Sequence, residues 1–150
     1  MDINKKDGMN YAPKGSANKV VGPGEFKVGV GALDHGHIYG MCNGLKEAGA
    51  EIVYVYDEDP KKIEEFQEKF PEAKAVNSVD EILNDPEIKM LAAAAIPNLR
   101  SALGNKAMKA GKDYFTDKTG LTSLDQLEET KKVVKETGRR YFVYFSERLH

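Results

Sequence analysis

A turn of small residues follows the first apolar run of the chain and is the segment best suited to chemistry. It reads Gly29-Val30-Gly31-Ala32-Leu33-Asp34-His35-Gly36-His37 and precedes a helical pattern. Small residues let backbone amides approach a phosphate, and the first N–H groups of a helix attract anions. The spacing departs from G-x-G-x-x-G because Asp34 replaces the last glycine. Gly31 to His37 are therefore candidates for binding a dinucleotide diphosphate, although a plain turn with Asp34 as helix cap explains them equally.

A carboxylate follows the second apolar run. Asp57 comes directly after Glu51–Tyr56 and lies about 20 residues past Gly36, near the place where dinucleotide-binding domains hold the adenosine ribose. A carboxylate there would repel the additional phosphate of NADP, so NAD is favoured over NADP. Alternatively, Asp57 belongs only to the turn that ends at Pro60 and neutralises the start of the next helix.

Polar residues also follow two later apolar runs. Pro97 and Asn98 come after Met90–Ile96, where the backbone would pass close to the nicotinamide, and Asn98 also suits a helix cap. Lys118 follows Asp113–Thr116. A lysine beside a nicotinamide can hold a substrate hydroxyl and assist proton transfer. Surface lysines are usually only solvated, and the residue alone favours that second interpretation.

His35 and His37 invite a metal interpretation, but the sequence predicts no metal site. The two histidines stand two residues apart at a helix start, and no nearby Cys or Glu completes a ligand set.

The elements that must position these residues alternate between strand and helix patterns. Met90–Ile96 is apolar without alternation, which is typical of a parallel strand covered on both faces. Gly36, Gly40 and Gly44 form a stripe on the first helix, which we expect to pack closely against the sheet. We expect strands at 26–31, 51–56, 73–76, 90–96, 113–116 and 141–145, with helices at 37–46, after Asp59, after Ser78, after Asn98 and after Ser123. This order predicts an α/β fold with a doubly wound parallel sheet, a Rossmann fold.

Length and composition limit the protein class. The chain has 150 residues, 41% hydrophobic and 31% charged, with a net charge of −2. We therefore expect a flexible or loosely docked tail over 1–25 and one domain over 26–150. The mixed charges argue against nucleic acid or a membrane as partner. One cysteine and no secretion signal favour a cytoplasmic protein. Association into a homo-oligomer stays open.

Taken together, the ordered segments resemble the glucose–fructose oxidoreductase / inositol dehydrogenase (Gfo/Idh/MocA) family. The resemblance covers Phe26 to His150 and rests on a series of four motifs. These are Ala32–His37, Tyr54–Asp57, Ala94–Asn98 and Gly111–Lys118. The ordered series is far more specific than any one member.

The resemblance implies an NAD(P) domain followed by a larger α+β domain that binds sugars, cyclitols or related compounds. It assigns Ile96, Pro97, Asn98 and Asp117 to the cofactor. The family's Glu-Lys-Pro motif maps onto Asp117-Lys118-Thr119, so Lys118 would be the catalytic lysine.

Three departures from the family pattern matter. Ala32 stands where related chains carry the first turn glycine, and Thr119 replaces a proline that would help to hold Lys118. The chain also stops at His150, so we expect the second domain to be absent and the chain alone to be catalytically incomplete. The first hypothesis is an NAD(P)-dependent oxidoreductase acting on a sugar, cyclitol or polyol. The alternative is a truncated or degenerate nucleotide-binding module without activity of its own.

Overall fold

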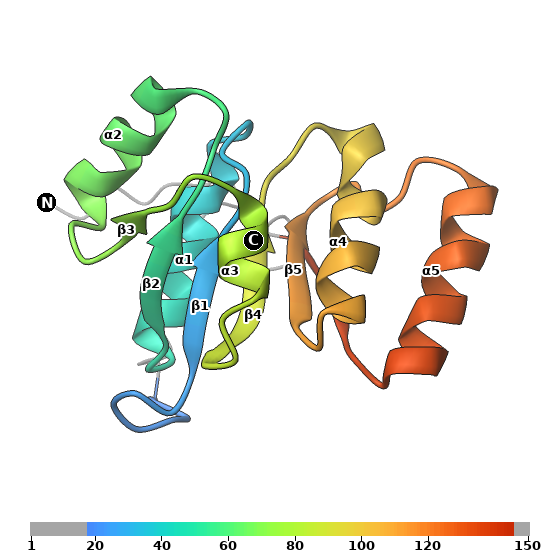
Figure 1. Cartoon of the computed structure of the whole chain (residues 1–150), viewed down its shortest axis with the longest axis horizontal. Coiled ribbons are helices and arrows are strands. Elements are labelled where there is room, and N and C mark those ends of the chain that lie inside the picture. The colour runs from blue at the N-terminus through green and yellow to red at the C-terminus, as the bar shows by residue number, and fades with distance from the viewer. Residues whose placement is uncertain (1–17, 146–150) are drawn as a thin grey trace, which may run out of the picture.

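Apolar strands alternate with amphipathic helices throughout the part of the chain that the structure describes. The structure is a computed structural model, and it describes residues 18–145. The strands are β1 (Lys27–Val30), β2 (Glu51–Val55), β3 (Lys74–Ala75), β4 (Ile88–Ala93), β5 (Asp113–Asp117) and β6 (Tyr141–Tyr144). The helices are α1 (His37–Glu47), α2 (Pro60–Lys69), α3 (Val79–Leu83), the 3₁₀ turn η1 (Pro97–Leu99), α4 (Arg100–Lys109) and α5 (Leu124–Thr137) (Figure 1).

The six strands form one parallel sheet in the order β3-β2-β1-β4-β5-β6. The chain starts in the middle, winds outward through β2 and β3, and returns to place β4 on the other side of β1. This confirms the predicted doubly wound Rossmann sheet. Because every strand is parallel, the loops after β1, β2, β4 and β5 all meet at the carboxyl edge.

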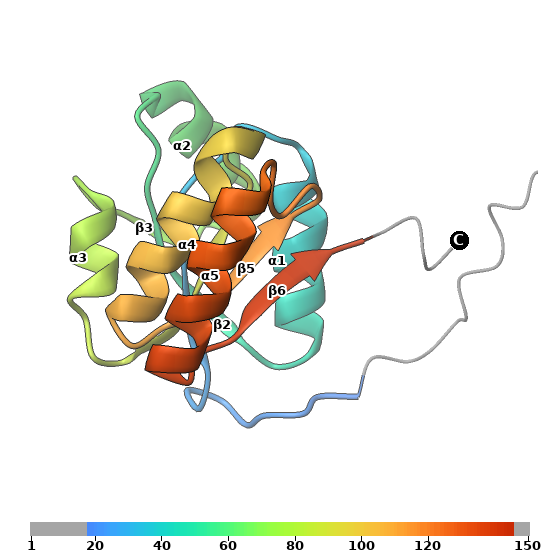
Figure 2. The ribbon, with the colours of Figure 1, turned by 90° about the vertical axis from the view of Figure 1, so that its right-hand side faces the viewer.

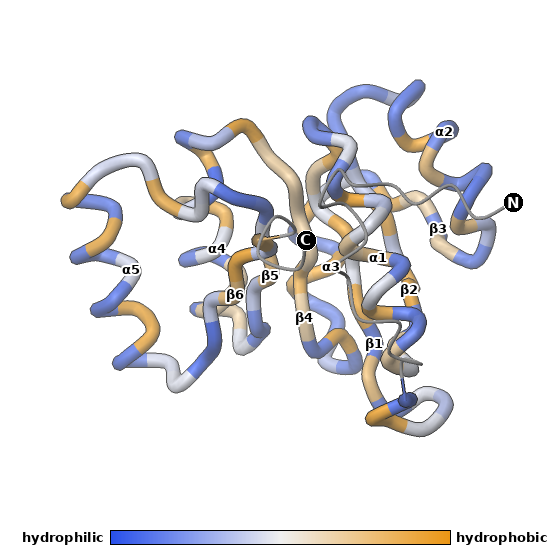
Figure 3. The backbone as a smooth tube through the Cα atoms, turned by 180° about the vertical axis from the view of Figure 1, so that it is seen from behind, coloured by the Kyte–Doolittle hydropathy of each residue, from blue (hydrophilic) through white to orange (hydrophobic). Residues whose placement is uncertain are grey.

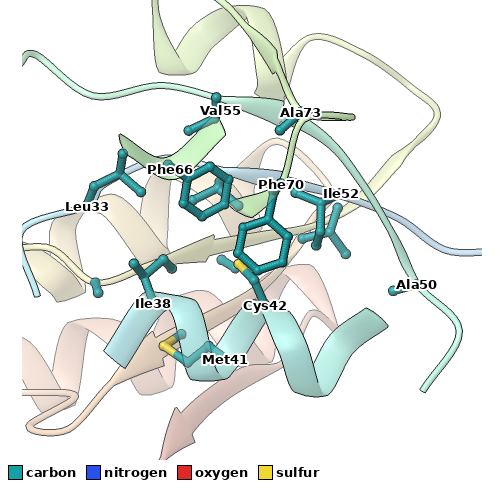
Figure 4. Packing of buried hydrophobic residues seen from close by; sticks show 14 of the residues in the cluster. Leu33, Ile38, Met41, Cys42, Ala50, Ile52, Val55, Phe66, Phe70 and Ala73 are labelled. Atoms are coloured by element: carbon teal, nitrogen blue, oxygen red, sulfur yellow. The ribbon is translucent and has the colours of Figure 1, made fainter. Parts of the chain in front are cut away.

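Helices cover both faces of the sheet, and each face has its own core. Helices α4 and α5 lie on one side and α1 on the other (Figure 2). On the α1 side, Phe66 and Phe70 stack at 4.8 Å between ring centroids, above Cys42 and Met41 (Figure 4). On the other side, Tyr114 and Met108 are fully buried. Hydrophobic residues run along β4, whereas hydrophilic and hydrophobic residues alternate along α5 (Figure 3).

Local residues define several helix ends, and the helix starts expected after Ser78 and Ser123 are confirmed. Ser78 and Glu81 form the reciprocal capping box of α3, and the side chain of Ser123 accepts a hydrogen bond from the Gln126 amide at the start of α5. Gly138 ends α5 with a left-handed φ of 66°, which glycine adopts at no steric cost.

Two local expectations are wrong. Asn98 does not cap α4. The chain forms the 3₁₀ turn η1 after Ile96, and α4 follows with Leu99 at its N-cap and no side-chain cap. A strand predicted at 90–96 instead spans Ile88–Ala93, since the backbone leaves the sheet before Ala94 to build the carboxyl-edge loop.

The glycine stripe on α1 does not pack against the sheet as expected. Gly36, Gly40 and Gly44 are all exposed. A Cβ at Gly36 or Gly44 would meet nothing within 4 Å, and one at Gly40 would only approach the Tyr144 hydroxyl at 3.3 Å. The buried face of α1 is formed by Ile38, Met41 and Cys42 instead.

The end of the predicted N-terminal tail is held against the turn between α1 and β2. The Val20 amide donates to the Ala48 carbonyl at 2.8 Å, and Gly49 has a φ of 107° beside Val21. Residues 1–17 of that tail and residues 146–150 lie outside the described residues. Among residues 18–145, every helix is too short or too polar to cross a membrane.

Glycines in the strand and on the helix surface give a matched pair of stability predictions. A Cβ at Gly29 would lie 2.2 Å from Cγ2 of Ile82 on α3, so Gly29→Ala should lower the free energy of unfolding by about 1–3 kcal/mol. Gly44→Ala should instead raise it by about 0.5–1 kcal/mol, because the helical site is open. Urea unfolding followed by circular dichroism measures both. Equal stability of the two variants would contradict the packing described here.

Cys42 reports on the core beneath α1. Its thiol is fully buried, and burial raises its pKa to about 12. At pH 8 the folded chain should react with Ellman's reagent at least about a hundredfold more slowly than the chain in guanidinium, because the thiolate is the reactive form. Cys42 is the only cysteine in the sequence, so the released chromophore reports this site alone. Prompt labelling of the folded protein would show that the core opens.

Candidate functional site

A pocket opens at the carboxyl edge of the sheet, where the strand order reverses between β1 and β4. Its volume is about 290 Å³. Open α/β sheets bind ligands at such switch points. A larger hollow of about 470 Å³ lies between α4 and α5, but it opens in the outer helix layer, away from this edge. The pocket at the sheet edge is lined by Gly31, Ala32, Asp34, Tyr56, Asp57, Glu58, Ala95, Ile96, Leu99 and Leu103.

The loop after β1 is fixed to β4 by backbone hydrogen bonds. The Gly31 and His35 amides donate to the carbonyls of Ala92 and Ala94 at 2.9 and 3.1 Å, and the Ala94 amide donates back to Ala32. Within residues 18–145, the amides of Ala32, Asp34 and Gly36 have no protein acceptor. These three N–H groups, beside the start of α1, are the donors that an anionic diphosphate could use.

Asp57 joins the loop after β1 to the end of β2. Its side chain is 9% exposed, and Oδ2 accepts a hydrogen bond from the Leu33 amide at 2.9 Å. Oδ1 accepts another from the Asp59 amide at 2.8 Å. An ionised carboxylate has about four acceptor positions, so Asp57 can still accept from a ribose hydroxyl in the pocket that it lines. The Leu33 side chain itself packs in the core.

Asp34 does not cap α1, which has Gly36 at its N-cap and no side-chain cap. Its carboxylate pairs with Lys62 of α2 at 2.9 Å, and this hydrogen bond raises the pKa of Lys62. The pair therefore offsets the negative charge that Asp34 would otherwise place beside a phosphate.

The residues after β4 form the opposite wall. Ile96 is 51% exposed and faces the pocket with Leu99, while Pro97 and Asn98 are exposed in η1. The Asn98 carbonyl accepts a hydrogen bond from Gln126 of α5 at 3.1 Å. Of the three residues predicted from this segment, Ile96 lines the pocket, whereas Pro97 and Asn98 do not.

Asp117, at the end of β5, contacts both histidines of the first turn. Its carboxylate oxygens lie 3.0 and 3.1 Å from Nδ1 of His37 and 3.2 Å from Nδ1 of His35, and its side chain is 1% exposed. The Lys118 amide donates to the same carboxylate at 2.8 Å. These residues are far apart in sequence, so spacing alone gave no sign of the contact.

Arg100 was missed by sequence reasoning and connects the loops after β4 and β5. It is 2% exposed, and its Nε donates to the Ala95 carbonyl at 2.7 Å. One terminal nitrogen donates to the carbonyls of Asp117 and Thr119 at 3.3 and 3.0 Å. The other lies 3.8 Å from the Asp117 carboxylate. A buried charge needs such partners, and these hold the backbone on both sides of Lys118. An arginine within a helical pattern carries no sequence sign of burial.

Lys118 itself lies at the carboxyl edge directly after β5, as predicted. It is partly exposed, and its peptide bond to Thr119 is cis. Arg100 donates to the carbonyls of the residues on either side of Lys118, and the Asp117 carboxylate accepts from the Lys118 amide.

Removing the Arg100 side chain should destabilise the fold. Arg100→Met leaves the Asp117 carboxylate and three carbonyls with fewer donors, so the free energy of unfolding should fall by about 3–5 kcal/mol. Arg140→Met, at an exposed position, is the control and should change it by less than about 0.5 kcal/mol. Urea unfolding measures both. Similar effects of the two substitutions would show that the buried network contributes little.

The comparisons with known proteins agree with this geometry. A family model described as "Oxidoreductase family, NAD-binding Rossmann fold" (GFO_IDH_MocA) matches residues 27–145. A D-xylose dehydrogenase of Paenarthrobacter nicotinovorans is 35% identical over 77 residues, which cover 51% of this chain and 20% of that protein. The scyllo-inositol 2-dehydrogenase (NADP(+)) of Bacillus subtilis strain 168 is 28% identical over 87 residues, covering 58% of this chain and 24% of that protein.

A solved structure described as an oxidoreductase, from Erwinia carotovora atroseptica SCRI1043, is similar with a TM-score of 0.79 and 38% identity. The match covers 81% of this chain and 37% of that one, so the chain spans well under half the length of these relatives. The sheet order, the pocket at its switch point and the family match together establish that this chain belongs to the Gfo/Idh/MocA oxidoreductase family and comprises its NAD-binding Rossmann domain.

Proposed function

We propose that the pocket between β1, β2 and β4 binds NAD in preference to NADP, for oxidoreductase chemistry on a sugar, cyclitol or polyol. The observation that carries the proposal is the position of Asp57. Its carboxylate is held at the pocket wall by two backbone amides, at the tip of the strand next to the phosphate-binding loop.

The diphosphate would lie against the free amides of Ala32, Asp34 and Gly36. The adenosine ribose would donate its hydroxyls to Asp57, and the nicotinamide end would pass Ile96 toward the loop after β5. This arrangement uses the anion-binding property of a helix N-terminus and an acidic ribose partner together.

The charges at the ribose end support NAD over NADP. Asp57 and Glu58 both line the pocket, whereas Lys62 of α2 is paired with Asp34. An additional phosphate on the ribose would therefore be repelled by the carboxylates of Asp57 and Glu58. Lys62 would not offset this repulsion, because it is already paired with Asp34. The relative from Bacillus subtilis that uses NADP shows that the family accommodates both cofactors.

Lys118 is proposed as the residue that assists proton transfer. When bound, the nicotinamide supplies or accepts a hydride at a carbon of the substrate. The Lys118 amine would take the proton from the hydroxyl on that carbon, leaving a carbonyl group, and would return it in the reverse direction. Asp117 and Arg100 would position Lys118 by fixing the backbone on either side of it.

Calorimetric titration with NAD and NADP tests the cofactor assignment. We expect the chain to bind NAD more tightly than NADP. Asp57→Ala should abolish measurable NAD binding, because it removes both the ribose acceptor and the anchor of the loop. Glu58→Arg should strengthen NADP binding by about fivefold, since it replaces a repulsive surface charge by an attractive one.

Glu47→Arg is the matched control for the charge change. Glu47 is exposed at the far end of α1 and does not line the pocket, so this variant should leave the ratio of the two affinities unchanged. Absence of heat with either cofactor would remove the binding proposal. A turnover assay across sugars and inositols then separates the oxidoreductase, which forms NADH steadily, from the alternative, a nucleotide-binding module that binds without turnover.

A further inference from the structure

Two histidines and a carboxylate converge where the first turn of α1 meets the end of β5. His35 and His37 both direct Nδ1 toward Asp117, at 3.2 Å and 3.0 Å from its oxygens. The three candidate ligand atoms all lie within 4.8 Å of one another. The cluster lies outside the pocket assigned to the cofactor, because none of the three residues lines it.

The separations of Asp117 from the two imidazoles are close to those between ligands of one metal ion. In tetrahedral zinc sites the metal lies about 2.0–2.1 Å from nitrogen and oxygen ligands, so neighbouring ligand atoms are about 3.3 Å apart. The contacts of Asp117 with the two imidazoles need to lengthen by only a few tenths of an ångström to reach that value. Two imidazoles and one carboxylate are also a ligand set that catalytic zinc sites use, with a fourth position open.

The hydrogen bonding of His35 supports a cation between these groups. Its Nδ1 lies 3.1 Å from the His37 amide, which could donate to it, and 3.2 Å from an Asp117 oxygen. A ring nitrogen offers either one proton or one lone pair. With a lone pair it would face the carboxylate unfavourably, and with a proton it could not accept from the amide. A divalent ion bound to Nδ1 and the carboxylate would remove the repulsion between them, and Nδ1 would then bind the ion in place of the amide proton.

The surroundings set the direction from which an ion would enter. The side chains of His35 and His37 are 52% and 33% exposed, whereas Asp117 is 1% exposed. The opposing charge is Arg100, which lies 3.8 Å from the buried side of the carboxylate and donates mainly to backbone carbonyls. An ion and its water would therefore enter from the side of the partly exposed histidines.

We propose that His35, His37 and Asp117 form a binding site for one divalent transition-metal ion, with Zn²⁺ as the leading candidate. Imidazole ligands favour zinc, cobalt, nickel and copper over magnesium or calcium. The bound ion would tie the loop after β1 to the end of β5, next to Lys118, and would keep one coordination position for water or a substrate oxygen.

Cobalt(II) titration of the metal-free full chain tests the site directly. We expect one equivalent of Co²⁺ to give the intense visible absorption bands of four-coordinate cobalt, and Zn²⁺ to displace it. His35→Ala and His37→Ala should each weaken binding by at least about tenfold, with circular dichroism confirming that the variants fold. Asp117→Asn should also weaken binding. Because Asp117 is buried, its substitution can disturb the fold, so the exposed His35 is the more decisive position for the test.

The remaining histidine of the chain supplies the control. His150→Ala should bind Co²⁺ as the unaltered chain does, because the sequence contains only three histidines and the two proposed ligands are the other two. No visible bands, or equal affinity in the His35→Ala and His37→Ala variants, would overturn the proposal. The titration contains no nucleotide, so its result stands apart from that of the NAD experiment.

Discussion

Buried carboxylates must be given hydrogen-bond donors, and two such groups hold the loop after β1 from opposite sides. Asp57 accepts from the Leu33 amide on the β2 side, and Asp117 contacts His35 and His37 on the β5 side. Each carboxylate also has a partner outside the loop, Asp57 in the Asp59 amide and Asp117 in the Lys118 amide and Arg100, and the loop adds to these contacts because an unpaired charge in the interior costs several kcal/mol. The loop that borders the pocket is therefore held by charges that come from the ends of two other strands.

The fold was largely predictable because its signals are local. Continuous apolar runs marked the buried strands, and Ser78 and Gly138 marked helix ends through hydrogen bonds and a backbone conformation that neighbouring residues decide. The failures have equally local causes. Asn98 has the chemistry of a cap, but the preceding Pro97 begins a 3₁₀ turn and moves the helix start onward. The glycine stripe of α1 has helical periodicity, but periodicity does not say which side of a helix faces the sheet.

The candidate site, too, could be predicted from the sequence only in part. Asp57 could be found from the sequence because the distance from the glycine turn to the next strand's tip is fixed by one βαβ unit. Arg100 and the contact between Asp117 and the histidines could not be found, since they join segments that meet only when β5 takes its place beside β4. Lys118 was identified by resemblance, and the structure adds the residues that fix its backbone.

The irregular turn is compatible with nucleotide binding for a reason that its sequence alone does not reveal. A glycine at position 34 would place no charge beside the loop after β1. Asp34 places a negative charge there, and Lys62 of α2 forms an ion pair with it. The same pairing engages Lys62, so the departure from the glycine pattern and the proposed preference for a cofactor without the additional phosphate would share one cause. If a diphosphate binds to the amides of Ala32, Asp34 and Gly36, the ion pair between Asp34 and Lys62 reduces the repulsion that the Asp34 carboxylate would otherwise cause. Under this proposal, discrimination between the cofactors would depend on the carboxylates of Asp57 and Glu58, which line the pocket.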